Sequence, residues 1–481
     1  MTTKLSWSKL LCSKSTRRVL LGDTKVSTGG GDLRTRFERD IGKVIFSTPF
    51  RRLQDKAQVF PLEPMDGIRN RASHSLEVAN VAKDLAKAVV AKLIENNIQQ
   101  FSQDEIDSIT NISYVGGLLH DLGNPPFGHA GEDAIKMWFE EKDEEFWKHY
   151  GLSEKYTELR NEFKYFDGNA QTLRLVSRLQ VVSDLNGLNL TSGSFAPLIK
   201  YEADCRSLKK NVHHFSKLGY FQTEQELVSK VREEISSVGM RHPLTFLIEA
   251  ADDIVYGIAD VEDAIKKKVI NWGQVKNLLD NEAEDQHWTQ IQRELCTKII
   301  GESESFLRSK IADLDRQLID HDEAVAQVYR TRVIRQAVSA VRDQFIENYE
   351  SIMNGTYHNE LIKDSDVAAV YRCLKKKIGG PLIYQCKEAL ELEVLGINII
   401  RGLMDIFIKG FAGGSEGNTT LDFNKKIMNL YSRNYRLAFE EAKARGNFPE
   451  GYLQLRLLTD YVCGMTDTFA LNLYRKLSRE R

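Results

Sequence analysis

The spacing of the apolar residues sets the strongest limit on the fold. Apolar side chains recur at three- and four-residue steps, the period of one helix face. One such run is formed by Val78, Ala82, Leu85, Val89 and Leu93. The chain has only nine prolines in 481 residues, less than half the usual share of about 5%. Because proline interrupts helices, its scarcity favours long helices over a turn-rich β fold. We predict an all-α fold.

The charges of the chain nearly cancel. It has 66 Lys+Arg and 68 Asp+Glu, which gives a formal net charge of −2. Overall charge therefore cannot drive binding to nucleic acid, and any such contact needs a local basic patch. With 42% apolar and 28% charged residues, the chain can bury a large core beneath a charged surface. This composition excludes disorder as its dominant state.

No segment has the run of roughly 18 consecutive apolar residues that a membrane span needs. The best window, residues 394–411, is broken by Asn398, Arg401, Asp405 and Lys409. The basic start of the chain lacks the apolar region of a signal peptide. The six cysteines are scattered without a C-x-x-C pair, which is typical of reduced thiols. We expect a cytoplasmic protein that does not enter a membrane.

Shifts in composition divide the chain into four parts. We expect a polar, partly mobile segment that ends in a Gly-rich stretch, a core, an accessory helical region, and a C-terminal helical segment that packs on the core. Their predicted ranges are 1–33, 34–270, 271–411 and 412–481. Within the core, the charged stretch 140–165 is expected to be a solvated helical insertion. The clearest late linker is 412–420, with the sequence AGGSEGNTT.

Metal-binding side chains occur at three separated places, each on a predicted helix of otherwise apolar residues. They are His74, the pair His120-Asp121, and the pair Asp252-Asp253. An imidazole or carboxylate that faces a core is costly unless it is paired or binds something. Two imidazoles and two carboxylates from three helices could hold a divalent cation. The alternative is that each is a core or capping residue with its hydrogen bonds satisfied.

The order H…HD…D resembles the HD-domain metal-dependent phosphohydrolases. The flanking sequence is more specific and resembles bacterial deoxyguanosine triphosphate triphosphohydrolases. The similar segments appear in the order of that family, from about residue 34 to the C-terminus. They are residues 50–62 (FRRLQDKAQVFPL), 120–132 (HDLGNPPFGHAGE), 166–171 (FDGNAQ), 249–262 and 461–467 (YVCGMTD). Residues 270–390 match only in their helical character. The resemblance places an HD core at residues 34–270.

The resemblance also implies the roles of individual residues. The metal ligands would be His74, His120, Asp121 and Asp252. Neighbouring helical residues point about 100° apart, so Asp253 would be a supporting or solvated acid.

The catalytic pair would be His129 and Glu132, which share one helix face. A carboxylate beside an imidazole suits it to acid–base work. The ordinary alternative for this pair is a surface ion pair.

Further residues match positions that bind substrate in the family. The expected phosphate-binding residues are Arg51, Lys200, Tyr201 and Lys217. Gln58 would bond the 3′-hydroxyl of the sugar, and Tyr256 and Asp260 would line the sugar and phosphate end of the pocket. Tyr256 could equally be a core tyrosine. Arg433 and Arg436 could reach a neighbouring active site or be surface charges.

The resemblance implies hydrolysis of dGTP, with other dNTPs open, to deoxynucleoside and tripolyphosphate. Water would attack the α-phosphate with the help of Mn²⁺ or Mg²⁺. One alternative is a broad dNTP triphosphohydrolase activated by an effector nucleotide. Another is a regulator that binds single-stranded DNA through the basic clusters 209–210 and 375–377, with the HD site secondary. Relatives of the guanine-specific type bind single-stranded DNA, which is therefore a candidate effector. Relatives are hexamers or other closed assemblies, so we expect a homo-oligomer, with a hexamer favoured. Base preference is expected to depend on the middle region.

Overall fold

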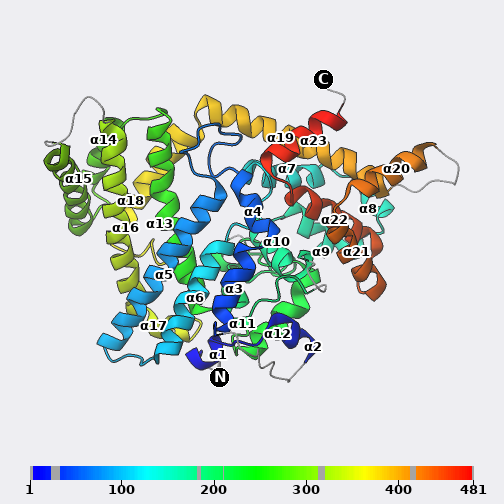
Figure 1. The fold of residues 1–481 in the computed structure, drawn as a ribbon, viewed down its shortest axis with the longest axis horizontal. Helices are drawn as coiled ribbons and strands as arrows, with labels where there is room; N and C mark the ends of the chain where they lie inside the picture. Colours follow the sequence, from blue (N-terminus) through cyan, green and yellow to red (C-terminus); the bar gives the residue numbers. More distant parts are fainter. Residues whose placement is uncertain are drawn as a thin grey trace.

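The structure, a computed structural model, describes residues 4–22, 33–180, 186–209, 211–311, 320–411 and 419–478. Within these ranges every secondary-structure element is a helix, and the only β pairing consists of isolated bridges. This confirms the all-α prediction (Figure 1). No helix in the described ranges is both long enough and apolar enough to cross a membrane.

The helices of ten or more residues carry most of the architecture. They are α3 (Arg36–Ile45), α5 (Arg71–Glu95), α6 (Gln103–Leu119), α7 (Gly128–Glu140), α12 (Gln225–Glu234), α13 (Pro243–Lys266), α14 (Trp272–Ala283), α15 (Gln290–Ile311), α16 (His321–Glu347), η7 (Leu374–Tyr384), α19 (Lys387–Phe407), α20 (Thr419–Leu430), α21 (Arg433–Arg445), α22 (Glu450–Cys463) and α23 (Asp467–Leu477).

Shorter helical turns connect them. They are α1 (Trp7–Leu10), α2 (Thr16–Leu21), α4 (Thr48–Arg52), η1 (Leu53–Asp55), α8 (Glu144–His149), η2 (Glu154–Tyr156), α9 (Thr157–Lys164), α10 (Gly168–Arg174), η3 (Leu175–Leu179), α11 (Ser192–Phe195), η4 (Ala196–Leu198), η5 (His213–Phe215), η6 (Gln222–Glu224), α17 (Tyr349–Met353), α18 (Ala368–Cys373) and η8 (Ile408–Phe411).

Helix α5 packs against α6, α13 and α16, and α13 packs against α6 and α16 as well (Figure 1). Helix α5 begins with a capping box, in which Asn70 and Ser73 each accept a hydrogen bond from the backbone N–H of the other. Helix α13 begins at Pro243, a residue suited to the first helical turn, and His242 accepts from the backbone N–H of Leu244. The apolar faces of both helices are buried.

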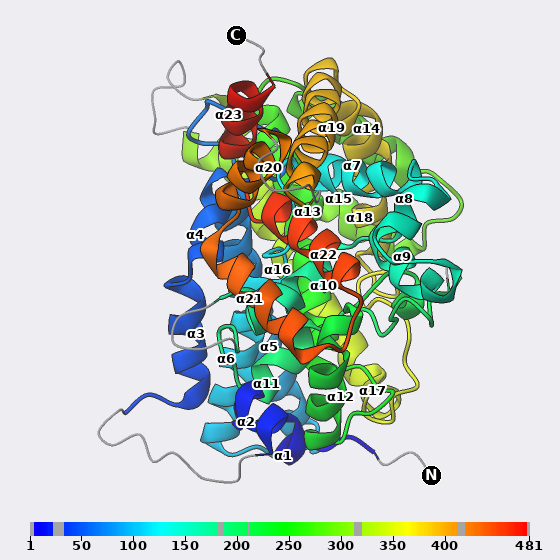
Figure 2. The same ribbon diagram turned by 90° about the vertical axis from the view of Figure 1, so that its right-hand side faces the viewer.

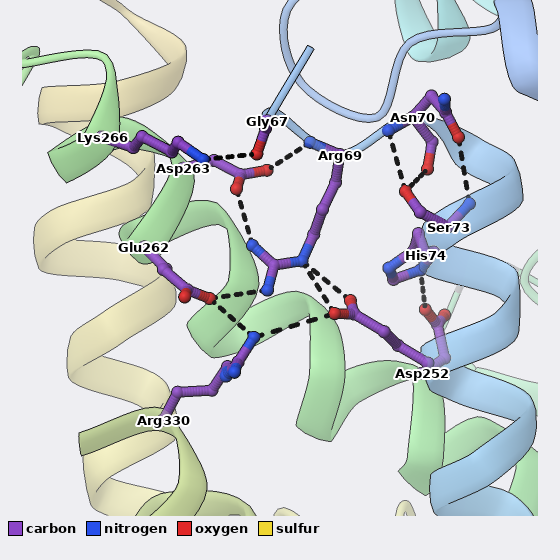
Figure 3. A network of polar contacts seen from close by, with 11 residues as sticks. Gly67, Arg69, Asn70, Ser73, His74, Asp252, Glu262, Asp263, Lys266 and Arg330 are labelled. Atoms are coloured by element: carbon purple, nitrogen blue, oxygen red, sulfur yellow. Dashed lines mark hydrogen bonds and ion pairs between the residues drawn. The ribbon is translucent and has the colours of Figure 1, made fainter. Parts of the chain in front are cut away.

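An ion-pair network fixes the start of α5 against the end of α13 (Figure 3). The guanidinium of Arg69 contacts Glu77 of α5 at 2.8 Å, and Glu262 and Asp263 of α13 at 2.6 Å each. Arg330 of α16 also reaches Glu262, at 3.0 Å. Because Arg69 is only 11% exposed, these contacts are poorly screened and pin three helices together. Two of these helices also carry predicted metal ligands: α5 carries His74 and α13 carries Asp252.

The region 271–411 packs directly on the core. Helix α16 lies against both α5 and α13, and α19 lies against α7 and α23 (Figures 1 and 2). Helix α22 is joined to α10 through the buried ion pair of Arg174 and Asp460, 2.6 Å apart. The four-part division of the chain stays a prediction.

Two stretches differ from the expectations of the sequence. Residues 140–165 are not a solvated insertion, because Trp147 and Phe163 are fully buried and pack with Phe139. Charged residues dominate the composition there and hide this aromatic cluster. Near the start of the chain, Trp7 and Leu10 are buried as well. The Gly-rich stretch 27–32 and most of the linker 412–420 lie outside the described residues.

Candidate active site

Four predicted metal ligands meet where α5, α13 and the end of α6 converge. Nε2 of His74 lies 3.2 Å from Oδ1 of Asp252. Nε2 of His120 lies 3.5 Å from the same Asp252 oxygen and 3.6 Å from Oδ2 of Asp121. The ligand atoms of His74, His120 and Asp121 all lie within 4.8 Å of one another. Two imidazoles and two carboxylates therefore face one small volume.

Neighbouring groups hold these side chains in a ligating orientation. The Nδ1 of His120 donates to the carbonyl oxygen of Gly117 at 2.7 Å, which directs Nε2 into the cluster. That Nε2 is buried and has no hydrogen-bond partner among the residues that the structure describes. Asn124 donates to Oδ1 of Asp121 at 2.7 Å, and Arg71 pairs with its Oδ2. The buried lone pair of His120 fits a divalent cation, as does the mixed nitrogen and oxygen donor set.

The electrostatics of the cluster also favour a cation. Burial opposes charge on His120, yet Asp121 and Asp252 raise its pKa to about 9. Burial likewise opposes charge on Asp121, but Arg71 and His120 lower its pKa to about 2. Both histidines hold the pKa of Asp252 well below its usual range despite burial. The carboxylates are thus ionised and attract positive charge, and a cation can replace the proton on His120.

Asp252 and Asp253 face different surroundings. Asp252 contacts both histidines, as described above. For Asp253, burial raises the pKa to about 7, and the nearby cations are Lys200 and Lys375. The geometry therefore favours Asp252 over Asp253 as the ligand.

A cavity of about 500 Å³ lies in front of the cluster, within the usual size range of small-molecule sites. His120, Asp121 and Asp252 form part of its wall. His74 is fully buried behind them.

His129 and Glu132 line the same cavity from the first turns of α7. Their Nδ1 and Oε2 atoms are 3.8 Å apart, and Lys136 approaches Oε1 of Glu132 at 3.0 Å. The side chain of His129 is 78% exposed and that of Glu132 only 6%. Burial opposes ionisation of Glu132, but His129 and Lys136 lower its pKa to about 2. An exposed imidazole thus sits beside a buried carboxylate.

Three of the four expected phosphate-binding residues line the cavity: Lys200, Tyr201 and Lys217. Both lysine ammonium groups lie over the Tyr201 ring, 5.8 and 5.9 Å from its centroid. Although burial opposes it, Tyr201 and Glu249 raise the pKa of Lys200. The pKa of Lys217 is raised chiefly by Asp167, whose carboxylate lies 3.5 Å away. Both ammonium groups are therefore charged.

The fourth, Arg51, is not among the lining residues of the cavity. Its exposed side chain donates to the carbonyl oxygen of Phe46 at 2.7 Å and to Thr48 at 3.1 Å, so its position does not support the prediction. The buried Arg71 lines the cavity instead. It precedes His74 by three residues on α5, a spacing that places both on one helix face. The three-residue spacing from His74 is the sequence signal from which the position of Arg71 could have been predicted.

The predicted sugar end contains Gln58 and Tyr256, both of which line the cavity. The Oε1 of Gln58 is buried, and no group in the described part of the chain hydrogen-bonds to it, as expected for an acceptor that a ligand hydroxyl would satisfy. Asp260 lies behind this wall, only 2% exposed. It accepts a hydrogen bond at 2.5 Å from Tyr384, which lines the cavity and stacks on Tyr256 with centroids 6.2 Å apart.

Comparison with known proteins agrees with this geometry. Residues 71–167 match the HD domain family. Over 98% of its length the chain is 36% identical to a deoxyguanosinetriphosphate triphosphohydrolase-like protein of Listeria monocytogenes serovar 1/2a, and equally to one of Listeria innocua serovar 6a. The alignments cover 99% of each relative.

The chain belongs to the deoxyguanosinetriphosphate triphosphohydrolase-like family. This confirms the predicted resemblance and supports a phosphohydrolase. The matched HD range contains His74, His120, Asp121, His129 and Glu132, whereas Asp252 lies beyond it.

The middle region of this triphosphohydrolase-like protein supplies part of the cavity wall. Lys375 and Tyr384 come from η7, and Ala389 and Glu393 from α19. The ammonium group of Lys375 lies 5.5 Å from the Tyr256 ring centroid. The sequence predicts that the middle region affects base preference. Of these four positions only Lys375 carries a sequence signal, as part of a basic cluster. No motif marks the others.

A second group of metal-binding side chains in this family member comprises His213, Glu249 and Glu360. Its carboxylates already have cationic partners. Arg241 contacts Glu249 at 2.7 Å, and Lys363 contacts Glu360 at 2.7 Å. Because the charges are compensated, this group is better explained as an ion-pair cluster beside the cavity.

Proposed function

We propose that the chain hydrolyses a deoxynucleoside triphosphate, with dGTP the first candidate, to deoxynucleoside and tripolyphosphate. The observation that carries the proposal is the shared cavity: the HD cluster and the pair His129–Glu132 open into one volume lined by Lys200 and Lys217. A substrate with about four negative charges needs such cations. The names of the relatives point to the same substrate class.

His74, His120, Asp121 and Asp252 would hold the divalent cation, Mn²⁺ or Mg²⁺. When bound there, it would supply Lewis-acid stabilisation of charge on the α-phosphate. Lys200 and Lys217 would hold the phosphate chain, and Arg71 would keep Asp121 ionised and oriented through their ion pair. Together these residues fix the phosphorus atom relative to α7.

His129 would carry the proton transfer. Its Nδ1 faces Glu132, so Nε2 is the atom free to exchange a proton with the attacking water or the 5′ oxygen. Glu132 stays ionised because its pKa is about 2, and it therefore stabilises the imidazolium form. The new bond joins the water oxygen to the α-phosphorus. The bond that breaks joins this phosphorus to the 5′ oxygen.

Product analysis tests the proposal. The four dNTPs are incubated with the protein and Mn²⁺ or Mg²⁺, and the products are separated by chromatography. Tripolyphosphate and deoxynucleoside in equal amounts support it. In ¹⁸O-labelled water, the label is expected in tripolyphosphate, because water attacks phosphorus. Pyrophosphate or inorganic phosphate as the primary product would contradict it, as would label in the deoxynucleoside.

The DNA-binding regulator is less well supported. Two members of the 375–377 cluster have local partners: Lys375 lies over Tyr256 in the cavity, and Lys377 pairs with Glu282 at 3.0 Å. Lys210 lies outside the described residues. Repeating the dNTP panel with single-stranded DNA and with mixed nucleotides separates the basal enzyme from an effector-activated one. The homo-oligomer, the hexamer and the cytoplasmic location stay predictions.

A further inference from the structure

A carboxylate near the C-terminal end of the described chain holds two segments of the cavity wall. Asp467, the first residue of α23, is 1% exposed. Its Oδ1 accepts a hydrogen bond from the backbone N–H of Phe127 at 2.9 Å. Its Oδ2 accepts one from the N–H of Ala57, also at 2.9 Å. Phe127 lies two residues before His129, and Ala57 lies directly before Gln58.

A second contact joins the same segments. The buried ammonium group of Lys56 donates to the carbonyl oxygen of Asn124 at 2.5 Å and to that of Cys463 at 2.8 Å. Asn124 in turn bonds Asp121. The turn between α22 and α23 is thus attached to the loop between the HD pair and α7.

The loop needs such support because its backbone is unusual. Phe127 has φ 61° and Gly128 has φ 58°, so two consecutive residues are left-handed. The left-handed backbone conformation is unfavourable for a residue with a Cβ and persists only where surrounding contacts enforce it. The side chain of Phe127, the N-cap residue of α7, makes no capping hydrogen bond. The carboxylate of Asp467 fixes the direction of the Phe127 amide and hence the start of the helix.

His129 depends on that backbone because its own side chain is held weakly. It is 78% exposed, and Glu132 is 3.8 Å away. By contrast, His120 is 10% exposed and bonded to a carbonyl. The direction of α7 therefore decides where the His129 imidazole points.

We propose that Asp467 is a positioning residue, which sets the place of His129 relative to Gln58 by holding the amides of Phe127 and Ala57. The proposal rests on the function proposed above. It assigns a role in the site to the segment Tyr461–Asp467, which contributes no lining residue to the cavity.

The test compares Asp467→Asn with Thr468→Ala. Asparagine keeps the shape but loses one of the two acceptor oxygens. Thr468 is the next residue of α23 and bonds Asp55 at 2.8 Å on the surface, so its loss weakens the docking of α23 without touching the cavity. Hydrogen exchange by mass spectrometry, which needs no activity, should show faster exchange at residues 57 and 123–128 in D467N only. Rapid exchange at these amides in the wild type would overturn the proposal even if D467N fails to fold.

Kinetics distinguish positioning from general destabilisation. D467N is expected to lower kcat about 10- to 100-fold, the loss expected for a misplaced catalytic group, with KM and Mn²⁺ affinity changed less than threefold. In a His129→Ala background the same substitution should have almost no effect, because Asp467 acts through His129. Equal losses in both backgrounds would overturn the proposal. If the wild type releases no tripolyphosphate, the proposed function fails. The hydrogen-exchange comparison still tests the role of Asp467, and unchanged exchange at residues 57 and 123–128 in D467N would overturn it.

Discussion

Two histidines of the cavity are held in opposite ways, and this difference matches the different work proposed for them. His120 is fixed by a carbonyl behind it and presents one buried nitrogen to two carboxylates. His129 is exposed, with Glu132 beside it. A ligand must keep one position, whereas a group that exchanges protons must reach substrate and solvent. The same residue type thus suits two roles through its contacts alone.

The metal site can be tested at His120. His120→Ala removes one donor from the cluster, so we expect Mn²⁺ binding to weaken at least tenfold and turnover to be lost. The protein should stay folded because its core is large. Isothermal titration with Mn²⁺ and circular dichroism measure the two effects. Wild-type Mn²⁺ affinity together with wild-type turnover would exclude the cluster as the metal site.

The role of the buried acid can be tested at Glu132. Glu132→Gln removes the charge that stabilises the His129 imidazolium, so kcat should fall by roughly two to four decades. KM should change little, because Lys200 and Lys217 are the residues proposed to hold the phosphates. Asp133→Asn is the matched control: Asp133 is 58% exposed and contacts the same Lys136 at 3.3 Å. Equal kcat in E132Q and D133N would make the pair structural.

Sugar selection can be tested at Tyr256, whose ring faces the cavity and stacks on Tyr384. A pocket that merely tolerates size rejects an added hydroxyl only about a hundredfold. An aromatic ring under C2′ would do better, because a clash displaces the sugar from Gln58. We expect Tyr256→Ala to narrow the preference for dGTP over GTP in kcat/KM about tenfold or more. Tyr256→Phe keeps the ring and should keep the preference, and unchanged discrimination in Y256A would place sugar selection elsewhere.

At the scale of elements, a buried acid links α13 to η7. Burial raises the pKa of Asp260 to about 7 from an ordinary 3.8, although the hydrogen bond from Tyr384 lowers it. Its Oδ1 is buried and has no hydrogen-bond partner within the described ranges. Between about pH 4 and 7 the native state keeps a proton that the unfolded state has lost. The free energy of unfolding contributed by this group therefore falls as pH rises through that window, and is constant above it.

Asp260→Asn removes this titration, because asparagine resembles the protonated acid. We expect the variant to gain stability relative to the wild type as pH rises from 4.5 to 7.5, by up to about 3 kcal/mol. Urea unfolding across this range measures it. Asp280→Asn, at an exposed position of α14, is the matched control for replacing a carboxylate with an amide. A pH-independent difference between D260N and the wild type would show that Asp260 is ionised throughout.

Elements with regular patterns could be predicted from sequence, and irregular ones could not. Helices α5 and α13 have long apolar stripes, and both lie where the spacing predicts them. The HD cluster could be predicted as well, because its polar residues interrupt those apolar stripes. By contrast, η7 contains Pro381 within a wide helical turn, and no local rule predicts that Tyr384 would then meet Asp260. The prediction that residues 140–165 are solvated was wrong for a related reason. Composition averages over all faces of a helix and so does not reveal that one face is buried.

At the scale of the whole molecule, the cavity wall is assembled from segments that are distant in the chain. Lining residues run from Ala57 to Glu393, and Asp467 supports two of them from outside. Such contacts depend on tertiary packing, which sequence periodicity does not encode. This explains the difference between the prediction, which placed Arg51 at the phosphates, and the structure, in which Arg71 lines the cavity wall. The family resemblance aligned residues along the chain, whereas the packing of α4 and α5 decides which guanidinium faces inward.

The contact between Asp467 and Ala57 joins residues 410 positions apart, and this bears on how the protein is made. During synthesis the histidines and carboxylates of the cluster leave the ribosome long before Asp467 does. Chain growth of about 5–20 residues per second leaves an interval of some ten seconds or more between the HD pair and the acid that orders the loop beside it. A nascent chain that ends before Asp467 lacks the carboxylate that accepts from the amides of Phe127 and Ala57. If Asp467 has the proposed role, His129 reaches its final position only once the C-terminal segment has docked.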